Sequence, residues 1–246
     1  MATAAHATIE LSACSHCAVR SRSLCAALDN LEINALNEIA TRKALHDGEY
    51  FVFEGDFVHS FANVVSGVAK LTQSLEDGRE QIVGVLFPSD FIGRAFSGPS
   101  SVYPCTVQAA GEVNLCVFPS ARFDRLLGQF PNLERKILEQ TQKELDTARD
   151  WLTMLGRKTA SERVATFLYH FATRSAESGC KAGNAFEMPF TRADIADFTG
   201  LTYETVSRQI SILRKQGIIA SETPRHISYV DMERLAECAG RGLSAH

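Results

Sequence analysis

The sequence predicts an α+β protein in which an N-terminal antiparallel β-roll (a jelly-roll sensor domain) precedes one long helix and a C-terminal winged helix-turn-helix. Three observations predict this order. From about Leu31 to Pro119, short apolar runs alternate with turn residues at roughly ten-residue intervals. No glycine or proline interrupts the chain between Pro131 and Gly156, and capped helical patterns follow Lys158.

The composition fits a globular chain with room for about two domains, since 45% of the 246 residues are hydrophobic and 22% are charged. The acidic excess lies before Lys158, so the C-terminal part tolerates phosphates better than the rest. We expect four segments: a cysteine-rich segment at 1–30, the β-roll at 31–129, a dimerisation helix at 130–157 and a winged helix-turn-helix at 158–246.

Several classes of protein are not expected. No apolar run approaches the roughly 18 residues that span a bilayer, and no signal peptide is recognisable, which predicts a cytoplasmic protein without membrane contact. In that reducing compartment the seven cysteines are not expected to form structural disulfides. The chain lacks a nucleotide-binding glycine loop, a nucleophile motif and paired catalytic carboxylates. We therefore expect that this protein is not an enzyme.

The β-roll is expected to contain strands at 50–53, 64–71 and 81–87, preceded by a short helix from Glu32 to Arg42. The long helix after Pro131 then carries small or apolar residues spaced alternately by three and four. This spacing predicts a coiled-coil seam, with a single amphipathic helix on its own sheet as the alternative. The seam would consist of Leu138, Thr141, Leu145, Ala148, Leu152 and Leu155. Two of these residues are small, so a modest dimer is expected.

After Lys158 we expect a helix over about 160–176, a loop at 178–184, two close helices and a hairpin that includes 218–220 and 227–230. Thr191 is suited to cap the first of the close helices, with Asp194 three positions on. Gly200 permits the tight turn, and Thr202 can cap the second helix, which should run to Gln216.

The second of these helices has two faces. Val206, Ile210 and Leu213 should pack inward. The other face presents Tyr203, Glu204, Ser207, Arg208 and Ser211. Arginine can donate two hydrogen bonds to guanine and glutamate can accept from cytosine, which predicts reading of the major groove. An i, i+4 ion pair between Glu204 and Arg208 on a solvated face is the alternative.

The run Glu204-Thr-Val-Ser-Arg208 resembles the recognition-helix signature of the CRP/FNR family, and the FNR branch in particular. The resemblance covers nearly the whole chain. It implies a homodimer that binds a pseudo-palindrome in double-stranded DNA with TTGAT-type half-sites. Arg208 and Glu204 would read the G·C pair and Ser207 would contact thymine. Tyr203 and Thr191 complete the candidate DNA-binding residues, and Tyr203 occupies a position where the cyclic-AMP branch usually has arginine.

Cyclic nucleotide is not expected as the ligand of the β-roll. The nucleotide-binding branch holds ribose with a Gly-Glu pair and phosphate with an Arg-Ser or Arg-Thr pair. The comparable stretches, 91–96 and 101–106, contain neither pair. Arg94 alone leaves a phosphate contact open.

The pattern Cys14-x2-Cys17-x7-Cys25 places three thiolates within reach of one soft metal centre. On spacing alone, zinc, redox chemistry and an iron–sulfur cluster all remain open. Cys180 and Cys238 are interpreted as incidental, and His16 as an exposed loop residue.

The FNR branch implies an oxygen-labile [4Fe-4S] cluster, held by three N-terminal cysteines and one on a strand just before a proline. Leu115–Pro119 has that form, which favours Cys116 as the fourth ligand. Cys105 is the rival, since a hairpin about Gly111-Glu112 would bring both cysteines to one sheet end. The x7 spacing differs from the x5 spacing of the best-known member and resembles a recognised subgroup. Leu24 is expected to shield the cluster.

The resemblance further implies that the intact cluster favours dimerisation and that oxygen reverses this. Members of the branch can carry an acidic residue on the dimer face near position 148, where repulsion helps keep the cluster-free protein monomeric. Here Asp146 and Asp150 flank this position, but Ala148 itself is neutral, so we expect dimerisation to depend less on oxygen. The loop 74–79 is expected either to contact RNA polymerase or to be a plain hairpin turn. The competing hypotheses are a cluster-free FixK-like or cysteine-redox regulator and a zinc-stabilised interaction protein.

Overall fold

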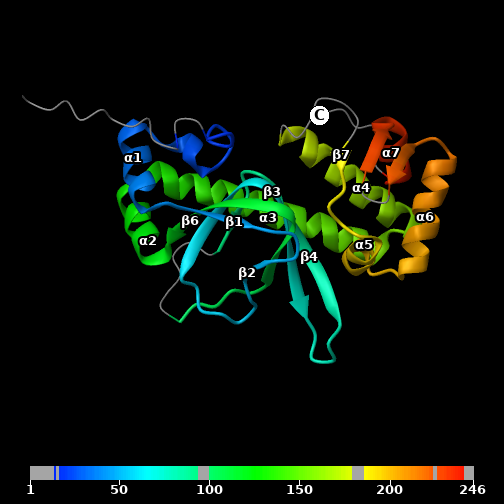
Figure 1. Cartoon of the computed structure of the whole chain (residues 1–246), viewed down its shortest axis with the longest axis horizontal. Coiled ribbons are helices and arrows are strands. Elements are labelled where there is room, and N and C mark those ends of the chain that lie inside the picture. The colour runs from blue at the N-terminus through cyan, green and yellow to red at the C-terminus, as the bar shows by residue number, and fades with distance from the viewer. Residues whose placement is uncertain (1–13, 15–16, 94–99, 179–185, 224–225, 241–246) are drawn as a thin grey trace, which may run out of the picture.

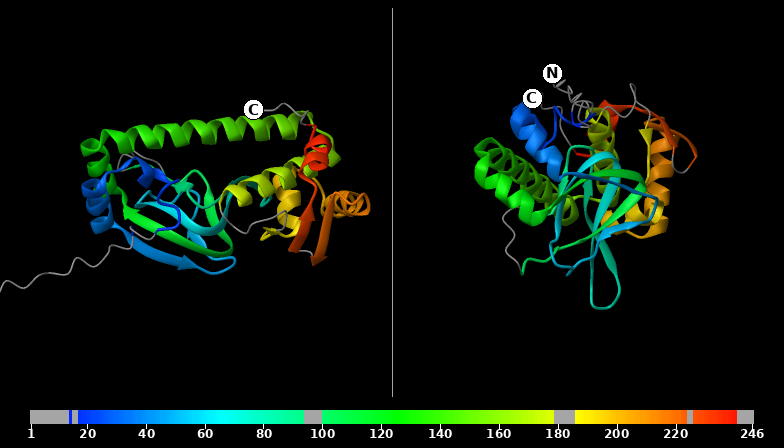
Figure 2. Two further views of the ribbon diagram at one scale, coloured as in Figure 1. Left: turned by 90° about the horizontal axis from the view of Figure 1, so that it is seen from above. Right: turned by 60° about the vertical axis from the view of Figure 1, so that its left-hand side comes forward.

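A computed structural model describes residues 14, 17–93, 100–178, 186–223 and 226–240 of the chain. The β-roll and the C-terminal domain lie at opposite ends of the long helix α3 (Pro131–Arg157), which runs along the length of the molecule (Figures 1 and 2). None of the helices in these ranges combines the length and the apolar character that a membrane span requires. The predicted fold class is confirmed.

The β-roll is built on two long antiparallel strands, β3 (Ser60–Ser74) and β6 (Thr106–Pro119). The strand order is β1-β6-β3-β4, with β2 also paired to β6 and β5 to β3. The remaining strands are β1 (Thr41–Leu45), β2 (Tyr50–Val52), β4 (Glu80–Leu86) and β5 (Phe91–Ile92). The three predicted strands are therefore confirmed, and the one predicted at 64–71 is longer at both ends.

The hairpin expected about Gly111-Glu112 is wrong, because β6 continues through this point as one strand. Gly111 has a φ of +85°, and the register with β3 shifts between Ser66 and Val68 opposite it. On β3, Gly67 has a φ of +83°, and a Cβ there would collide with the carbonyl oxygen of Glu112. The two glycines therefore let the paired strands bend sharply together without reversing direction.

The helix expected at Glu32–Arg42 is shifted, since α1 covers Asn30–Ile39. Asp29 accepts hydrogen bonds from the amides of Leu31 and Glu32, and the Glu32 carboxylate accepts one from the Asp29 amide. This capping box fixes the start of the helix. The helix ends before Thr41 because the chain there enters β1 and pairs with β6.

Helix α3 joins two separate hydrophobic cores. Its first turns bury Leu133 and Ile137 with the short 3-10 helix η1 (Leu24–Ala27), α1 and α2 (Ser120–Gln129). Its last turns bury Trp151 and Met154 in the core of the C-terminal domain. A third core fills the β-roll itself. The position of α3 in two cores allows a change at one end to reach the other.

The C-terminal domain has the predicted winged helix-turn-helix. It contains α4 (Ala160–Glu177), β7 (Phe186–Glu187), α5 (Arg192–Thr199), α6 (Tyr203–Lys215), β8 (Ile219–Thr223), β9 (His226–Val230) and α7 (Met232–Cys238). The caps expected from Thr191 and Thr202 are confirmed, and Gly200, which was expected to permit the tight turn, adopts a left-handed conformation. Strand β7 and helix α7 were not predicted, and most of the loop expected at 178–184 lies outside the described residues.

Candidate DNA interface and cysteine site

Helix α6 presents the predicted face to solvent. Val206, Ile210 and Leu213 are buried in the domain core, as expected. On the opposite face Tyr203 is 56% exposed, Glu204 and Arg208 are exposed, and Ser207 is half-buried. These four side chains are therefore accessible on one helix of a width that a major groove admits.

The chemistry of Glu204 suits an acceptor in the groove. Its own backbone amide and the Thr202 hydroxyl hydrogen-bond the carboxylate and hold its pKa below the usual range. The side chain is therefore ionised at neutral pH and can only accept hydrogen bonds. Cytosine N4 is the donor of matching position in a G·C pair.

Thr191 has a structural role at the start of α5. Its hydroxyl donates to Asp194 Oδ2 at 2.7 Å and accepts from the Asp194 amide at 3.1 Å. Asp194 also accepts a 2.6 Å hydrogen bond from Lys70 on β3. Burial raises the pKa of Asp194, but the bonds from Lys70 and Thr191 outweigh burial and leave the pKa lowered. The Lys70–Asp194 ion pair attaches the helix-turn-helix to the β-roll.

The four predicted cysteine ligands line one small cavity between the N-terminal loop and β6. Cys14 and Cys116 are each 8% exposed, while Cys17 and Cys25 are half-buried. The other residues that line the cavity are Arg20, Ile33, Leu36, Arg42, Asn63 and Phe118. Leu24, which was expected to shield the cluster, is fully buried in the adjoining core and does not line the cavity. The chain thus brings together four thiols that are separated by up to 102 positions in sequence.

The surroundings of Cys14, Cys25 and Cys116 disfavour their thiolate forms, but the nearby arginines favour an anionic group. Burial raises the pKa of Cys25 to about 11 and that of Cys116 to about 12. Arg42 opposes this shift at Cys116, which it faces across the β1–β6 pair, and Arg20 and Arg42 both oppose it at Cys14. Two guanidinium groups beside four thiolates compensate part of their charge.

The donor set fits a cluster better than a single ion. Among the described residues, no three His, Cys, Asp or Glu side chains converge closely enough to hold one metal ion. A single zinc ion needs each sulfur at about 2.3 Å. A [4Fe-4S] core is also bound by four cysteine thiolates, but it spreads them around a larger body. The four thiols that line one small cavity provide that number and kind of donor.

Cys105 does not belong to this site. It precedes the first residue of β6, whereas Cys116 lies near the far end of that strand, and it does not line the cavity. Cys105 was a rival ligand only because a hairpin at Gly111 would have brought it close to Cys116, and β6 makes no such hairpin. Cys238 ends α7 and packs on the domain core, rather than lying in a tail. His16, Arg94 and Cys180 lie outside the described residues.

Sequence reasoning missed the two arginines of the cavity. Arg20 lies between Cys17 and Cys25 in the sequence. A basic residue there could have been recognised as a group that stabilises the neighbouring thiolates. Arg42 was assigned to a helix, so its place opposite Cys116 required the strand register. Asn37 of α1 was also missed, and it accepts a hydrogen bond from the Cys14 thiol at 3.1 Å.

Comparison with known proteins shows which family has this fold. Residues 162–238 match the Crp-like helix-turn-helix domain, and residues 42–130 match the cyclic nucleotide-binding domain. The transcriptional activator protein FnrL of Cereibacter sphaeroides is 41% identical over 92% of both chains. The nitrogen fixation regulation protein FixK of Bradyrhizobium diazoefficiens is 40% identical over 84% of this chain and 86% of its own.

Among solved structures, FixK2 from Bradyrhizobium japonicum superposes with a TM-score of 0.74 at 31% identity, covering 84% of this chain and all of that one. These likenesses define a winged-helix transcription regulator with a β-roll. The chain belongs to the CRP/FNR family. It is a DNA-binding regulator of the FNR/FixK type and not an enzyme.

Proposed function

We propose that this protein is a homodimeric transcription activator that senses oxygen through a [4Fe-4S] cluster bound by Cys14, Cys17, Cys25 and Cys116. The observation that carries the proposal is that all four thiols line one cavity beside two arginines. When bound, the cluster would supply an oxygen-labile centre. The similarity to activators such as FnrL supports the part of the proposal that concerns transcription activation.

The cysteine site is connected to the dimerisation helix through one core. Cys14 and Cys116 are buried in the same cluster of side chains as Leu133 and Ile137 of α3, and η1, which contains Cys25, packs against that helix. Thiols that share one ligand hold the N-terminal loop on β6. Release of the thiols removes that anchor and exposes the first turns of α3 to rearrangement.

The exposed face of α3 offers the surface for dimerisation. Leu138, Leu145 and Leu152 are 58%, 50% and 70% exposed, and Thr141 and Ala148 are exposed between them. This row supports the coiled-coil interpretation, because an isolated chain leaves it in water. Leu155 differs, since it is half-buried and packs on the core of its own C-terminal domain.

We further propose that two copies of α6 read the half-sites of a TTGAT-type palindrome, with Glu204, Ser207 and Arg208 at the bases. The turn between β3 and β4 is proposed to contact RNA polymerase. It projects from the β-roll in Figure 1, with Asp77 and Arg79 exposed and paired at 2.8 Å. Cyclic nucleotide is not part of the proposal.

The second candidate function is a cluster-free regulator, favoured by the similarity to FixK in sequence and to FixK2 in structure. The two candidates differ in one measurement. Protein purified without oxygen should bind a TTGAT palindrome in a fluorescence anisotropy titration, and brief exposure to air should weaken that binding together with a loss of iron. Binding that is unchanged by air, from an iron-free protein, would favour the second candidate. A palindrome with scrambled half-sites is the control for both.

A further inference from the structure

We infer that Arg22 couples the cysteine loop directly to the DNA-binding domain of the same chain. The inference rests on the proposed cluster-dependent function and adds to it a route that does not pass through the dimer seam. It concerns the residues between Cys17 and Cys25 and the C-terminal end of α4.

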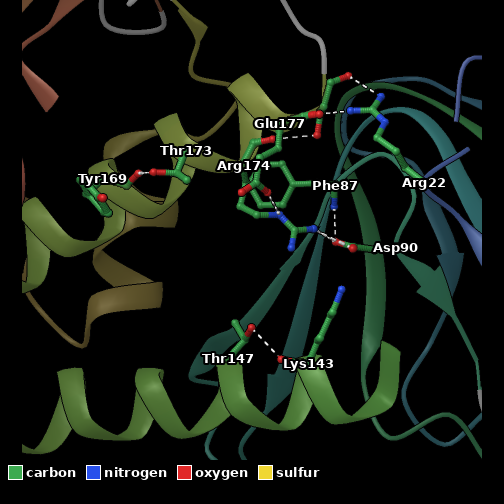
Figure 3. A network of polar contacts seen from close by, with 10 residues as sticks. Arg22, Phe87, Asp90, Lys143, Thr147, Tyr169, Thr173, Arg174 and Glu177 are labelled. Atoms are coloured by element: carbon green, nitrogen blue, oxygen red, sulfur yellow. Dashed lines mark hydrogen bonds and ion pairs between the residues drawn. The ribbon is translucent and has the colours of Figure 1, made fainter. Parts of the chain in front are cut away.

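The Arg22 guanidinium binds the end of α4 with both of its terminal nitrogens. Nη1 donates to the carbonyl oxygen of Glu177, and Nη2 donates to that of Ser178 at 3.0 Å (Figure 3). The last carbonyls of a helix lack partners within the helix and carry the negative end of its dipole. Ser178 itself caps the carbonyl of Arg174. A forked cation is suited to two adjacent carbonyls, so the contacts from Arg22 add partners for the last two carbonyls, those of Glu177 and Ser178.

The position of Arg22 depends on the loop that carries it. The Arg22 and Ser23 amides both donate to the carbonyl of Val19, at 3.1 and 2.9 Å. Val19 is 1% exposed, and the Ser23 side chain caps η1. Cys17 and Cys25 line the thiol cavity on either side of this turn. Binding of both thiols to one centre therefore anchors the turn at both ends and aims Arg22 at α4.

The end of α4 is a point from which the DNA-binding domain can be positioned. One turn before Ser178, Arg174 forms an ion pair with Asp90 of the β-roll at 2.7 Å. Arg22, Asp90, Arg174 and Glu177 line one cavity between the β-roll, α3 and α4. Helix α4 also packs on α5 and α6 of the helix-turn-helix. The Arg22 contact thus connects the cysteine loop to α4, the helix on which α6 packs.

Loss of the shared ligand frees Cys17 and Cys25, and the turn between them loses its anchors. The two hydrogen bonds from Arg22 then break, and the last turn of α4 frays. We expect DNA affinity to fall through this route in addition to any loss of dimer. The proposal requires that Arg22 act through the cluster state rather than through cluster binding itself.

The test compares full-length wild-type protein with Arg22→Ala, each prepared anaerobically with the cluster loaded and again after its removal. Ser21→Ala, an exposed neighbour in the same turn, is the control. Iron and sulfide content should be equal in all three proteins. We expect cluster removal to lower DNA affinity of the dimer and to speed amide exchange at 174–178 in wild type and S21A. In R22A the exchange should be fast in both states. The ratio of the DNA affinity with the cluster to the DNA affinity without it should be about tenfold or more lower than in wild type.

An R22A protein that binds iron normally and keeps the wild-type affinity ratio and exchange difference would overturn the inference. Loss of iron in R22A alone would overturn it as well, because Arg22 would then be needed for cluster binding. A wild-type protein that holds no iron would contradict the proposed function, and with it the coupling to the cluster. Iron content thus distinguishes failure of the coupling from failure of the sensor.

Discussion

The Nη2 atom of Arg174 lies 2.7 Å from both carboxylate oxygens of Asp90, which joins α4 of the DNA-binding domain to the turn between β4 and β5. Asp90 Oδ2 also accepts the amide of Phe87 at 2.9 Å, and the guanidinium lies 5.1 Å from the centre of the Phe87 ring. Figure 3 shows these three side chains together. The contact is therefore fixed on both sides and resists the rotation of one domain against the other.

A double-mutant cycle should measure this contact. Asp90→Asn and Arg174→Gln should show a coupling free energy of about 1–2 kcal/mol in urea unfolding, because the half-buried pair combines charge with hydrogen bonds. The exposed pair Asp146–Arg149, at 3.0 Å within one helix, is the control and should couple by less than about 0.5 kcal/mol. Equal couplings for the two pairs would contradict the account.

Acid should weaken the attachment of α5 to the β-roll through Asp194. Since its pKa in the folded state is lowered, its contribution is complete above the unfolded value of about 3.9 and is lost as the pH falls through the folded value. The difference in unfolding free energy between wild type and Asp194→Asn should thus be constant from neutral pH to about pH 5 and shrink below pH 4. Lys70→Met should remove most of this pH dependence; a pH-independent difference in the wild-type background would refute the assignment.

Arg208 should determine sequence specificity. Arg208→Ala should weaken binding to a TTGAT palindrome by about 1–3 kcal/mol at fixed salt and should relax discrimination at the G·C pair. Arg125→Ala removes the same charge from α2 and should change binding little. If R208A instead weakens binding equally for all sequences, with a lower salt dependence, Arg208 contacts phosphate rather than a base.

The exposed row on α3 should hold two chains together. Leu145→Lys and Leu152→Lys should leave the folded chain intact, because both side chains are at least half exposed within it, yet shift the protein to monomer in analytical ultracentrifugation. Thr153→Lys, on another face of the same helix, should remain dimeric. A dimer unaffected by L145K and L152K would place the interface elsewhere.

The elements that the sequence predicted well are those in which local pattern and tertiary packing agree. Helix α3 follows from uninterrupted helical spacing. The start of α5 follows from Thr191 and Asp194, because the side chain of each accepts a hydrogen bond from the backbone amide of the other. The buried and exposed faces of α6 follow from the same periodicity. These features need no knowledge of the rest of the chain.

The errors arose where a distant partner decides the structure. Gly111 permits a turn, but pairing with β3 on one side keeps β6 continuous. Arg42 continues a helical pattern in the sequence, but pairing with β6 places it in strand β1, opposite Cys116. The Arg22 contact spans 155 positions in sequence, and no local pattern indicates it. The spacing of Cys14, Cys17 and Cys25 indicated a shared site and the resemblance added Cys116, whereas the cavity that unites the four required the fold.

The central claim is that Cys14, Cys17, Cys25 and Cys116 hold one [4Fe-4S] cluster. The most direct test is the iron and acid-labile sulfide content of anaerobically purified wild type, Cys116→Ser and Cys105→Ser. The account predicts about four irons and four sulfides per chain in wild type and in C105S, and almost none in C116S. Iron-free wild type, or a C116S protein that keeps its iron, would contradict it.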